Sequence, residues 1–194
     1  AVGIRVADAK EAHDVSVANG GKSAKAPRTI VDEASGKSFT LSEIHYFGDV
    51  VLSFISGDYE GPMLPNYKAS AMAGLKDGPS SYGLQRLDHL VCNVPDLFAA
   101  QDFMSNVFGF HEFSEFTAED VGTVDSGLNS MVFASNNEFI LLPVNEPTHG
   151  TRRKSQIQTY LEHNNGSGVQ HMALMTDDIF HTMREMRKRS FCGG

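Results

Sequence analysis

The sequence predicts an α+β fold built from repeated modules of one strand, one helix and about three strands (βαβββ), with the last module truncated. Strand-like apolar runs alternate with amphipathic helices. A strand–turn–helix unit also recurs after 82 residues, which indicates repeated supersecondary units. The second copy stops after its helix and cannot bury that helix without its strands, so we expect an incomplete chain. The identical pairs at this offset are His89 and His171, Asp96 and Asp178, Phe98 and Phe180, and Met104 and Met186.

The opening segment is interpreted as a further, diverged copy of the module. Residues 2–6 form a short apolar run typical of a strand, and residues 8–19 have helical character that the following glycine pair would end. Residues 20–29 are rich in Gly, Lys, Ala and Ser and are predicted to be a loop. Residues 39–44 and 49–56 are predicted to be two strands joined by a turn.

Glycine, proline, aspartate and serine are dense over residues 57–83, which indicates a linker with some local order. We therefore divide the chain into three parts. Residues 1–60 are expected to be the C-terminal part of an N-terminal domain, and residues 61–84 the linker. Residues 85–194 are expected to be the first part of a second domain.

The second domain has the sharper pattern. A β-branched, apolar run over 87–94 predicts a strand, and a helix follows it with one apolar face. A last helix is expected after the strand at 169–175, with Ile179, Met183 and Met186 on its buried face. The remaining expected elements are strands at 111–116, 128–134 and 138–144, a loop at 145–150 and a short helix at 157–163.

Composition excludes several classes of protein. The 194 residues carry 16 Lys and Arg against 24 Asp and Glu, a net charge of -8, which argues against a nucleic-acid partner. No apolar run approaches the ~18 residues that span a bilayer, so no membrane partner is expected. The two cysteines, Cys92 and Cys192, cannot form a disulfide framework, which favours a reducing compartment. No targeting leader is visible, so we expect a cytoplasmic location and leave the chloroplast open.

Two of the eight histidines occupy equivalent places in the repeat. His89 and His171 lie near the middle of the first strand of each copy, so their imidazoles can converge if these strands are neighbours. Two neutral imidazoles and one carboxylate suit Fe(II) with open positions for other ligands. A single strand histidine among apolar neighbours is more commonly a hydrogen-bonded core residue, and both interpretations remain open here.

Several longer runs of residues resemble the 4-hydroxyphenylpyruvate dioxygenase family, most closely its plant and algal members. The resemblance is strong over residues 81–194 and looser over residues 1–56. Runs of this length in this order are more specific than any short motif. They are residues 86–89, 93–95, 115–123, 126–130, 145–147, 154–161, 170–174 and 178–180.

The resemblance implies a vicinal-oxygen-chelate fold and a catalytic, iron-binding domain that begins at residue 85. It implies Fe(II) held by two histidines, which match His89 and His171, and by a glutamate expected beyond Gly194. The implied reaction converts 4-hydroxyphenylpyruvate and O2 to homogentisate and CO2, in tyrosine catabolism. The resemblance also implies a homodimer for the full-length protein, and little activity for this chain alone because one ligand is missing.

The same resemblance assigns polar residues to the substrate pocket. Ser130, Asn145 and Gln156 match pocket positions, where amides and a hydroxyl can bind a phenol or a carboxylate without adding charge. Gln170 also matches, but its place next to His171 on a strand predicts that it points to the opposite face. We therefore expect it at most to support the metal ligands from behind, without contacting the substrate. Two alternatives remain: a hydroxymandelate synthase-like dioxygenase, and a binding module of the same fold without iron.

Overall fold

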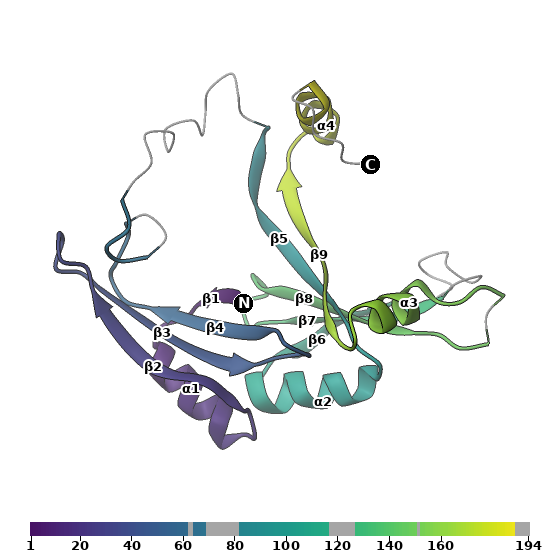
Figure 1. Ribbon diagram of the computed structural model, residues 1–194, viewed down its shortest axis with the longest axis horizontal. Coiled ribbons are helices and arrows are strands. Elements are labelled where there is room, and N and C mark those ends of the chain that lie inside the picture. Colours follow the sequence, from purple (N-terminus) through teal and green to yellow (C-terminus); the bar gives the residue numbers. More distant parts are fainter. Residues whose placement is uncertain (62–63, 69–81, 117–126, 151, 189–194) are drawn as a thin grey trace.

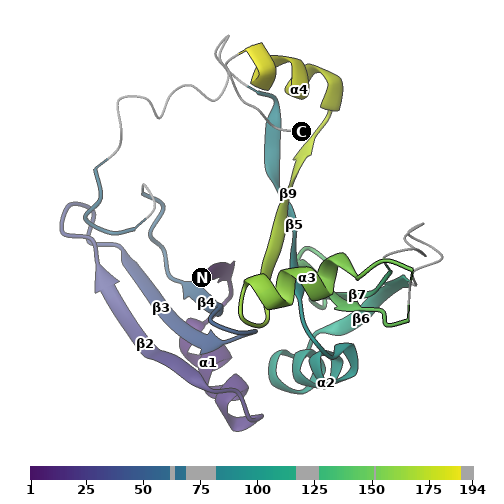
Figure 2. The same cartoon turned by 45° about the vertical axis from the view of Figure 1, so that its right-hand side comes forward.

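The computed structural model describes residues 1–61, 64–68, 82–116, 127–150 and 152–188. Two sheets lie side by side, with helices α1 and α2 next to each other beneath them (Figures 1 and 2). The first sheet and its helix comprise β1 (Val2–Arg5), α1 (Ala9–Ala18), β2 (Ser23–Val31), β3 (Ser38–His45) and β4 (Val51–Ser56). The second comprises β5 (Leu84–Asn93), α2 (Leu97–Phe108), β6 (His111–Phe116), β7 (Leu128–Ala134), β8 (Leu141–Pro147), α3 (Gln156–His163), β9 (Gly168–Thr176) and α4 (Ile179–Lys188).

Both sheets are built from the same βαβββ module. The first has the order β1-β4-β3-β2, and the second has the order β6-β7-β8-β5-β9. In each module the first strand pairs in parallel with the last, and the other pairings are antiparallel. The predicted α+β fold of βαβββ modules is therefore confirmed, and the opening segment has the topology of a full module.

Strand β9 begins a further copy of the module. It pairs antiparallel with β5, so the first strands of successive modules are direct neighbours. The two strands extend beyond the sheet as a ribbon, and α4 lies at its far end (Figure 1). This pairing brings the two histidines of the repeat onto adjacent strands.

Alternation along the strands separates a covered face from an open one. Leu90 and Cys92 of β5 are buried in the cluster that contains Met104 of α2, and Phe133 of β7 joins them. Helix α2 is well delimited, because the Asp96 side chain accepts a hydrogen bond from the Ala99 N–H at its start. At its end Gly109 adopts a left-handed φ of 66°, which glycine adopts without steric cost.

Aromatic side chains join the two modules. Phe47 of the first module lies 5.6 Å, centroid to centroid, from Phe103 of α2. Tyr46 and Phe54 lie 6.1 and 6.2 Å from Phe108, also on α2. Tilted and edge-on ring pairs at these distances stabilise the contact beyond simple burial. The two sheets therefore share one buried apolar cluster.

Three expectations about the elements were wrong. Residues 20–29 do not form a loop, since β2 covers Ser23–Val31. β2 is an edge strand, and its pairing register shifts between Lys25 and Arg28, which tolerates the missing N–H of Pro27. The expected loop at 145–150 begins later, because β8 continues to Pro147. The turn signals in both segments were outweighed by pairing with a neighbouring strand.

The third error concerns α4. Ile179 was expected on a buried face but is 55% exposed, whereas Thr182 is only 2% exposed. Thr182 donates a hydrogen bond through Oγ1 to the Tyr82 carbonyl at 2.7 Å. The helix is therefore held by a polar contact near its start, while Ile179 and Phe180 are exposed and the other two expected residues, Met183 and Met186, are half-buried.

Part of the expected linker has defined contacts. The Tyr59 N–H donates to the Ser38 carbonyl at 3.0 Å, and the Asn66 N–H donates to an Asp32 carboxylate oxygen at 2.9 Å. The chain after β4 thus folds back onto the β2–β3 hairpin, while residues 69–81 of the linker lie outside the described residues. The division into domains stays a prediction. None of the helices in the described part of the chain has the length and apolar character that crossing a bilayer requires.

Candidate functional site

The imidazoles of His89 and His171 face each other across β5 and β9. Their ring centroids lie 5.9 Å apart with an interplanar angle of 76°. His171 is opposite Val91 in the strand register, so the two rings are diagonal neighbours on adjacent strands. Side chains in such diagonal positions are within reach of each other. The convergence expected from the repeat is therefore present in the fold.

A bulge accompanies each histidine. The register shifts between Leu87 and His89, where Asp88 is the extra residue of β5. It shifts again between Val91 and Cys92, where Gln170 is the extra residue of β9. A bulge disrupts the strict alternation of a strand and re-aims the side chain at that point. Each extra residue consequently lies beside the ring of the histidine that follows it.

The bulge residues bond to the histidine rings. An Asp88 carboxylate oxygen lies 2.9 Å from Nδ1 of His89, and Oε1 of Gln170 lies 2.9 Å from Nδ1 of His171. Gln170 was expected on the opposite face from His171, and this was wrong, because Gln170 borders the same cavity as His171. In the described residues neither Nε2 atom has a hydrogen-bond partner, so both are available to a ligand.

The charges around the pair favour a neutral His171. Partial burial lowers the pKa of His171 below its usual value because it disfavours the charged ring, and electrostatic repulsion from the neighbouring His89 ring lowers it further. The hydrogen bond from His89, and then the Arg86 guanidinium, lower the pKa of the Asp88 carboxyl, which is therefore ionised at neutral pH. A neutral imidazole is the form that binds a metal.

The two rings border a cavity of ≈ 510 Å³ on the open face of the second sheet. Along β5, β7 and β8 its lining residues alternate with the core residues, so the cavity lies on the face opposite the buried cluster that includes Met104 of α2. All six residues that the sequence singled out border this one cavity. They are His89, Ser130, Asn145, Gln156, Gln170 and His171.

Ser130 and Asn145 form part of a polar row across the sheet. The two residues are opposite each other on β7 and β8, and they are 7% and 6% exposed. Asn145 is in turn opposite Asn93 of β5, and its Nδ2 donates to the Asn93 side-chain oxygen at 3.2 Å. Asn93 is fully buried and was not selected from the sequence. Its place on the same face as His89 was the signal that could have identified it.

Gln156 reaches the cavity from the first residue of α3. The helix start is fixed by Ser155, whose Oγ donates to the Gly127 carbonyl at 2.8 Å and accepts from the Ile157 N–H. Further along, the Tyr160 hydroxyl donates to the Val169 carbonyl of β9 at 2.8 Å. These bonds anchor α3 to β9 beside Gln170. A residue that looks like a helix-surface position therefore faces the cavity because of the way the helix is anchored.

The rest of the cavity wall is apolar and was missed from the sequence. Phe113 and Phe116 of β6 contribute aromatic rings that are 49% and 40% exposed. A strict period of two would place Phe113 and Phe116 on opposite faces, and both border the cavity because the β6–β7 register shifts between Glu112 and Ser114. The other apolar lining residues are Val91, Leu128, Val132, Leu141 and Pro143.

The side chains at the cavity supply some, but not all, of the ligands that a metal ion needs. No group of three or more His, Cys, Asp or Glu side chains capable of holding an ion occurs in the described ranges. His89 and His171 supply two imidazole nitrogens, each with its Nδ1 engaged by a neighbouring side chain, which is common for metal-binding histidines. Such a pair fits two positions of a two-histidine, one-carboxylate site.

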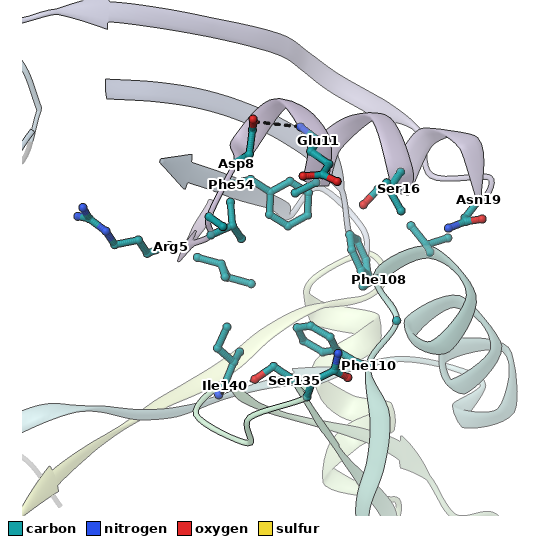
Figure 3. A pocket seen from close by; sticks show the side chains of 18 of the residues that line it. Arg5, Asp8, Glu11, Ser16, Asn19, Phe54, Phe108, Phe110, Ser135 and Ile140 are labelled. Carbon is teal, nitrogen blue, oxygen red and sulfur yellow. Dashed lines mark hydrogen bonds between the residues drawn. The ribbon is translucent and has the colours of Figure 1, made fainter. Parts of the chain in front are cut away.

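A larger cavity of ≈ 720 Å³ lies between the two modules (Figure 3). It is bordered by β1 and α1 on one side and by the end of α2 on the other, and no histidine or cysteine lines it. Asp8 already accepts from backbone N–H groups as the N-cap of α1, and Arg5 donates to the Gly57 carbonyl. These two charged side chains are thus used to hold local structure, and the smaller cavity, which the two histidines border, remains the candidate site.

The model of the Glyoxalase/Bleomycin resistance protein/Dioxygenase superfamily matches residues 86–191, more than half of the chain and the whole of the candidate site. The chain belongs to this superfamily. Within it, the chain is 53% identical over 196 residues to 4-hydroxyphenylpyruvate dioxygenase of Daucus carota and 52% identical over 198 residues to that of Arabidopsis thaliana. Each alignment covers 100% of this chain and 43% of the relative. The chain thus spans less than half the length of these relatives.

Among solved structures, a mutant of 4-hydroxymandelate synthase from Streptomyces coelicolor superposes with a TM-score of 0.76. The superposition covers 97% of this chain and 53% of that one, at 21% identity. A likeness at this identity shows the fold alone, and it agrees with the modular topology described above.

Proposed function

We propose that the whole protein is an Fe(II)-dependent dioxygenase that converts 4-hydroxyphenylpyruvate and O2 to homogentisate and CO2. The observation that carries the proposal is the convergence of His89 and His171 at a cavity whose polar lining is uncharged. The 53% identity to a relative of that name supports the choice of substrate.

In this proposal His89 and His171 hold the iron through Nε2, and a glutamate outside residues 1–194 supplies the third ligand. Bound Fe(II) would supply the redox centre at which the 2-oxo acid and O2 react. The protein's part is to present two imidazoles from adjacent strands, with their Nδ1 atoms engaged by Asp88 and Gln170. Rigid strands keep these two ligands at a fixed separation.

The cavity wall has the chemistry to bind an aromatic 2-oxo acid. Phe113 and Phe116 offer apolar contact for the ring, and Ser130, Asn145 and Gln156 offer neutral donors and acceptors for the phenol and carboxylate groups. The hydrogen bond from Asn145 to Asn93 fixes the orientation of its amide. Binding without extra charged groups leaves the metal as the centre that attracts the carboxylate.

The test uses the whole protein, loaded with Fe(II) without oxygen and then supplied with 4-hydroxyphenylpyruvate and O2. We expect about one iron per chain and release of homogentisate and CO2. His89→Ala and His171→Ala should each lose iron and activity, whereas His163→Ala, at the exposed end of α3, should retain both. An iron-free wild-type protein under these conditions would favour the binding module without iron.

Product analysis separates the two dioxygenase alternatives. The structural likeness to a 4-hydroxymandelate synthase concerns the fold alone, so the identity of the product must decide between the two reactions. Homogentisate as the aromatic product supports the proposal. Hydroxymandelate as the main product would contradict it while leaving the iron site in place.

A further inference from the structure

The two histidines of the site are held by chemically different partners. Both partners are bulge residues separated by the repeat offset, Asp88 on β5 and Gln170 on β9. Each lies 2.9 Å from Nδ1 of the following histidine. One is a carboxylate and the other an amide, so the two strands repeat the geometry and differ in the chemistry.

This difference decides whether each partner can fix which ring nitrogen of its histidine carries the proton. An ionised carboxylate can only accept hydrogen bonds. The proton in the hydrogen bond between Asp88 and His89 is therefore on Nδ1 of the ring. In the neutral His89 ring the lone pair then lies on Nε2, an atom to which the described residues offer no hydrogen-bond partner. An amide can accept through its oxygen or donate through its nitrogen, so Gln170 is compatible with either tautomer of His171.

Asp88 is itself held in place. The Arg86 guanidinium, two residues earlier on β5, lies 3.1 Å from the second carboxylate oxygen. The two oxygens of Asp88 thus have separate partners, Arg86 on Oδ1 and His89 on Oδ2. The Asp88 side chain is 34% exposed and that of His89 is 31% exposed, so the pair is partly shielded from water.

We propose that Asp88 is a positioning residue that sets the tautomer and ring orientation of His89, so that Nε2 is presented to the cavity as an acceptor. Gln170 orients the ring of His171 without setting its tautomer. The consequence for metal binding rests on the proposed function, whereas the tautomer itself does not require a metal. Arg86 supports the arrangement by fixing the carboxylate.

The experiment measures the 15N and 1H shifts of the His89 imidazole in the metal-free whole protein, assigned by comparison with His89→Gln. We expect the proton of wild-type His89 on Nδ1, and a shift toward the Nε2–H tautomer in Asp88→Asn. Affinity for Fe(II), titrated without oxygen, should fall roughly 10- to 100-fold in the same variant. The matched control is Asp102→Asn, an exposed aspartate on α2, which should change neither readout.

The outcomes separate this inference from the proposed function. A proton on Nε2 of wild-type His89 overturns the inference without any variant, so it remains testable even if Asp88→Asn does not fold. An unchanged tautomer and Fe(II) affinity in a folded Asp88→Asn also overturn it, while the dioxygenase proposal stands. The expected tautomer change in a protein that binds no Fe(II) supports the positioning role and contradicts the dioxygenase proposal.

Discussion

The two strand–helix units at the 82-residue offset have the same pattern and different surroundings. Leu90 of β5 is 5% exposed, whereas Met172, its equivalent on β9, is 64% exposed. Cys92 is fully buried, and its equivalent Leu174 is 51% exposed. The shared apolar cluster, which includes Met104 of α2, covers Leu90 and Cys92 of β5, while in the described chain α4 lies at the far end of the ribbon and the equivalent residues of β9 are exposed (Figure 2).

This contrast shows what a sequence repeat specifies. The residues of β9 and α4 are sufficient for a strand and a helix, because periodicity is a local property. Burial requires the remaining strands of a module, which supply the surface for the helix to cover. Equivalent substitutions in the two units should therefore have unequal effects on the chain of residues 1–194, measured by denaturant unfolding.

The largest difference is expected for a buried charge. Leu90→Asp places a carboxylate in the buried cluster and should cost more than about 4 kcal/mol of unfolding free energy, enough to unfold many domains. Met172→Asp places the same group on an exposed strand face and should change stability by less than about 1 kcal/mol. Equal losses in the two variants would show that the face of β9 is covered after all.

A smaller effect is expected for removal of a core side chain. Met104 is fully buried under the sheet, and Met104→Ala should cost about 2–5 kcal/mol through lost burial and the cavity left behind. Met186→Ala, at the equivalent place on α4, should cost less than about 1 kcal/mol. The midpoints of urea unfolding measure both, and a cost at Met186 as large as that at Met104 would contradict the comparison.

A third effect depends on pH. Burial raises the pKa of the Cys92 thiol to about 12, so the folded chain retains a proton that the unfolded chain loses above pH ~8.5. The unfolded state then binds fewer protons, and stability falls as pH rises, by about 1–2 kcal/mol between pH 8 and 10. Cys92→Ala should remove this loss. Leu174→Cys adds an exposed thiol and should cause no further loss of stability with rising pH. If the loss persists in Cys92→Ala, a group other than Cys92 causes it.

The smallest effect is expected where the two units agree. Phe98 and Phe180 are equivalent residues at the start of their helices, and they are 74% and 70% exposed. Replacement of either by Ser should change the unfolding free energy by less than about 0.5 kcal/mol. A loss above 1 kcal/mol at Phe98 alone would reveal a packing role for that ring that its exposure does not show.

Much of the fold could be predicted, because strands and helices follow local periodicity and turn chemistry. The helix at 97–108, between Asp96 and Gly109, is an example. β2 could not be predicted, since its Lys, Arg and Pro residues suit a loop and become a strand only by pairing with β3. The buried face of α4 was misplaced in part, because the buried residue of this helix is Thr182, which bonds to the Tyr82 carbonyl, whereas Met183 and Met186 are only half-buried.

For the candidate site, the sequence by itself determined which side chains are available: two histidines at equivalent places in a repeat, and a few neutral polar residues. Only the tertiary structure decided that β5 and β9 are antiparallel neighbours and that Gln170 shares the cavity with His171. It also decided that Asp88 contacts the ring of His89. The reason is physical: alternation along a strand is local, whereas a bulge and the choice of neighbouring strand depend on residues far away in the chain.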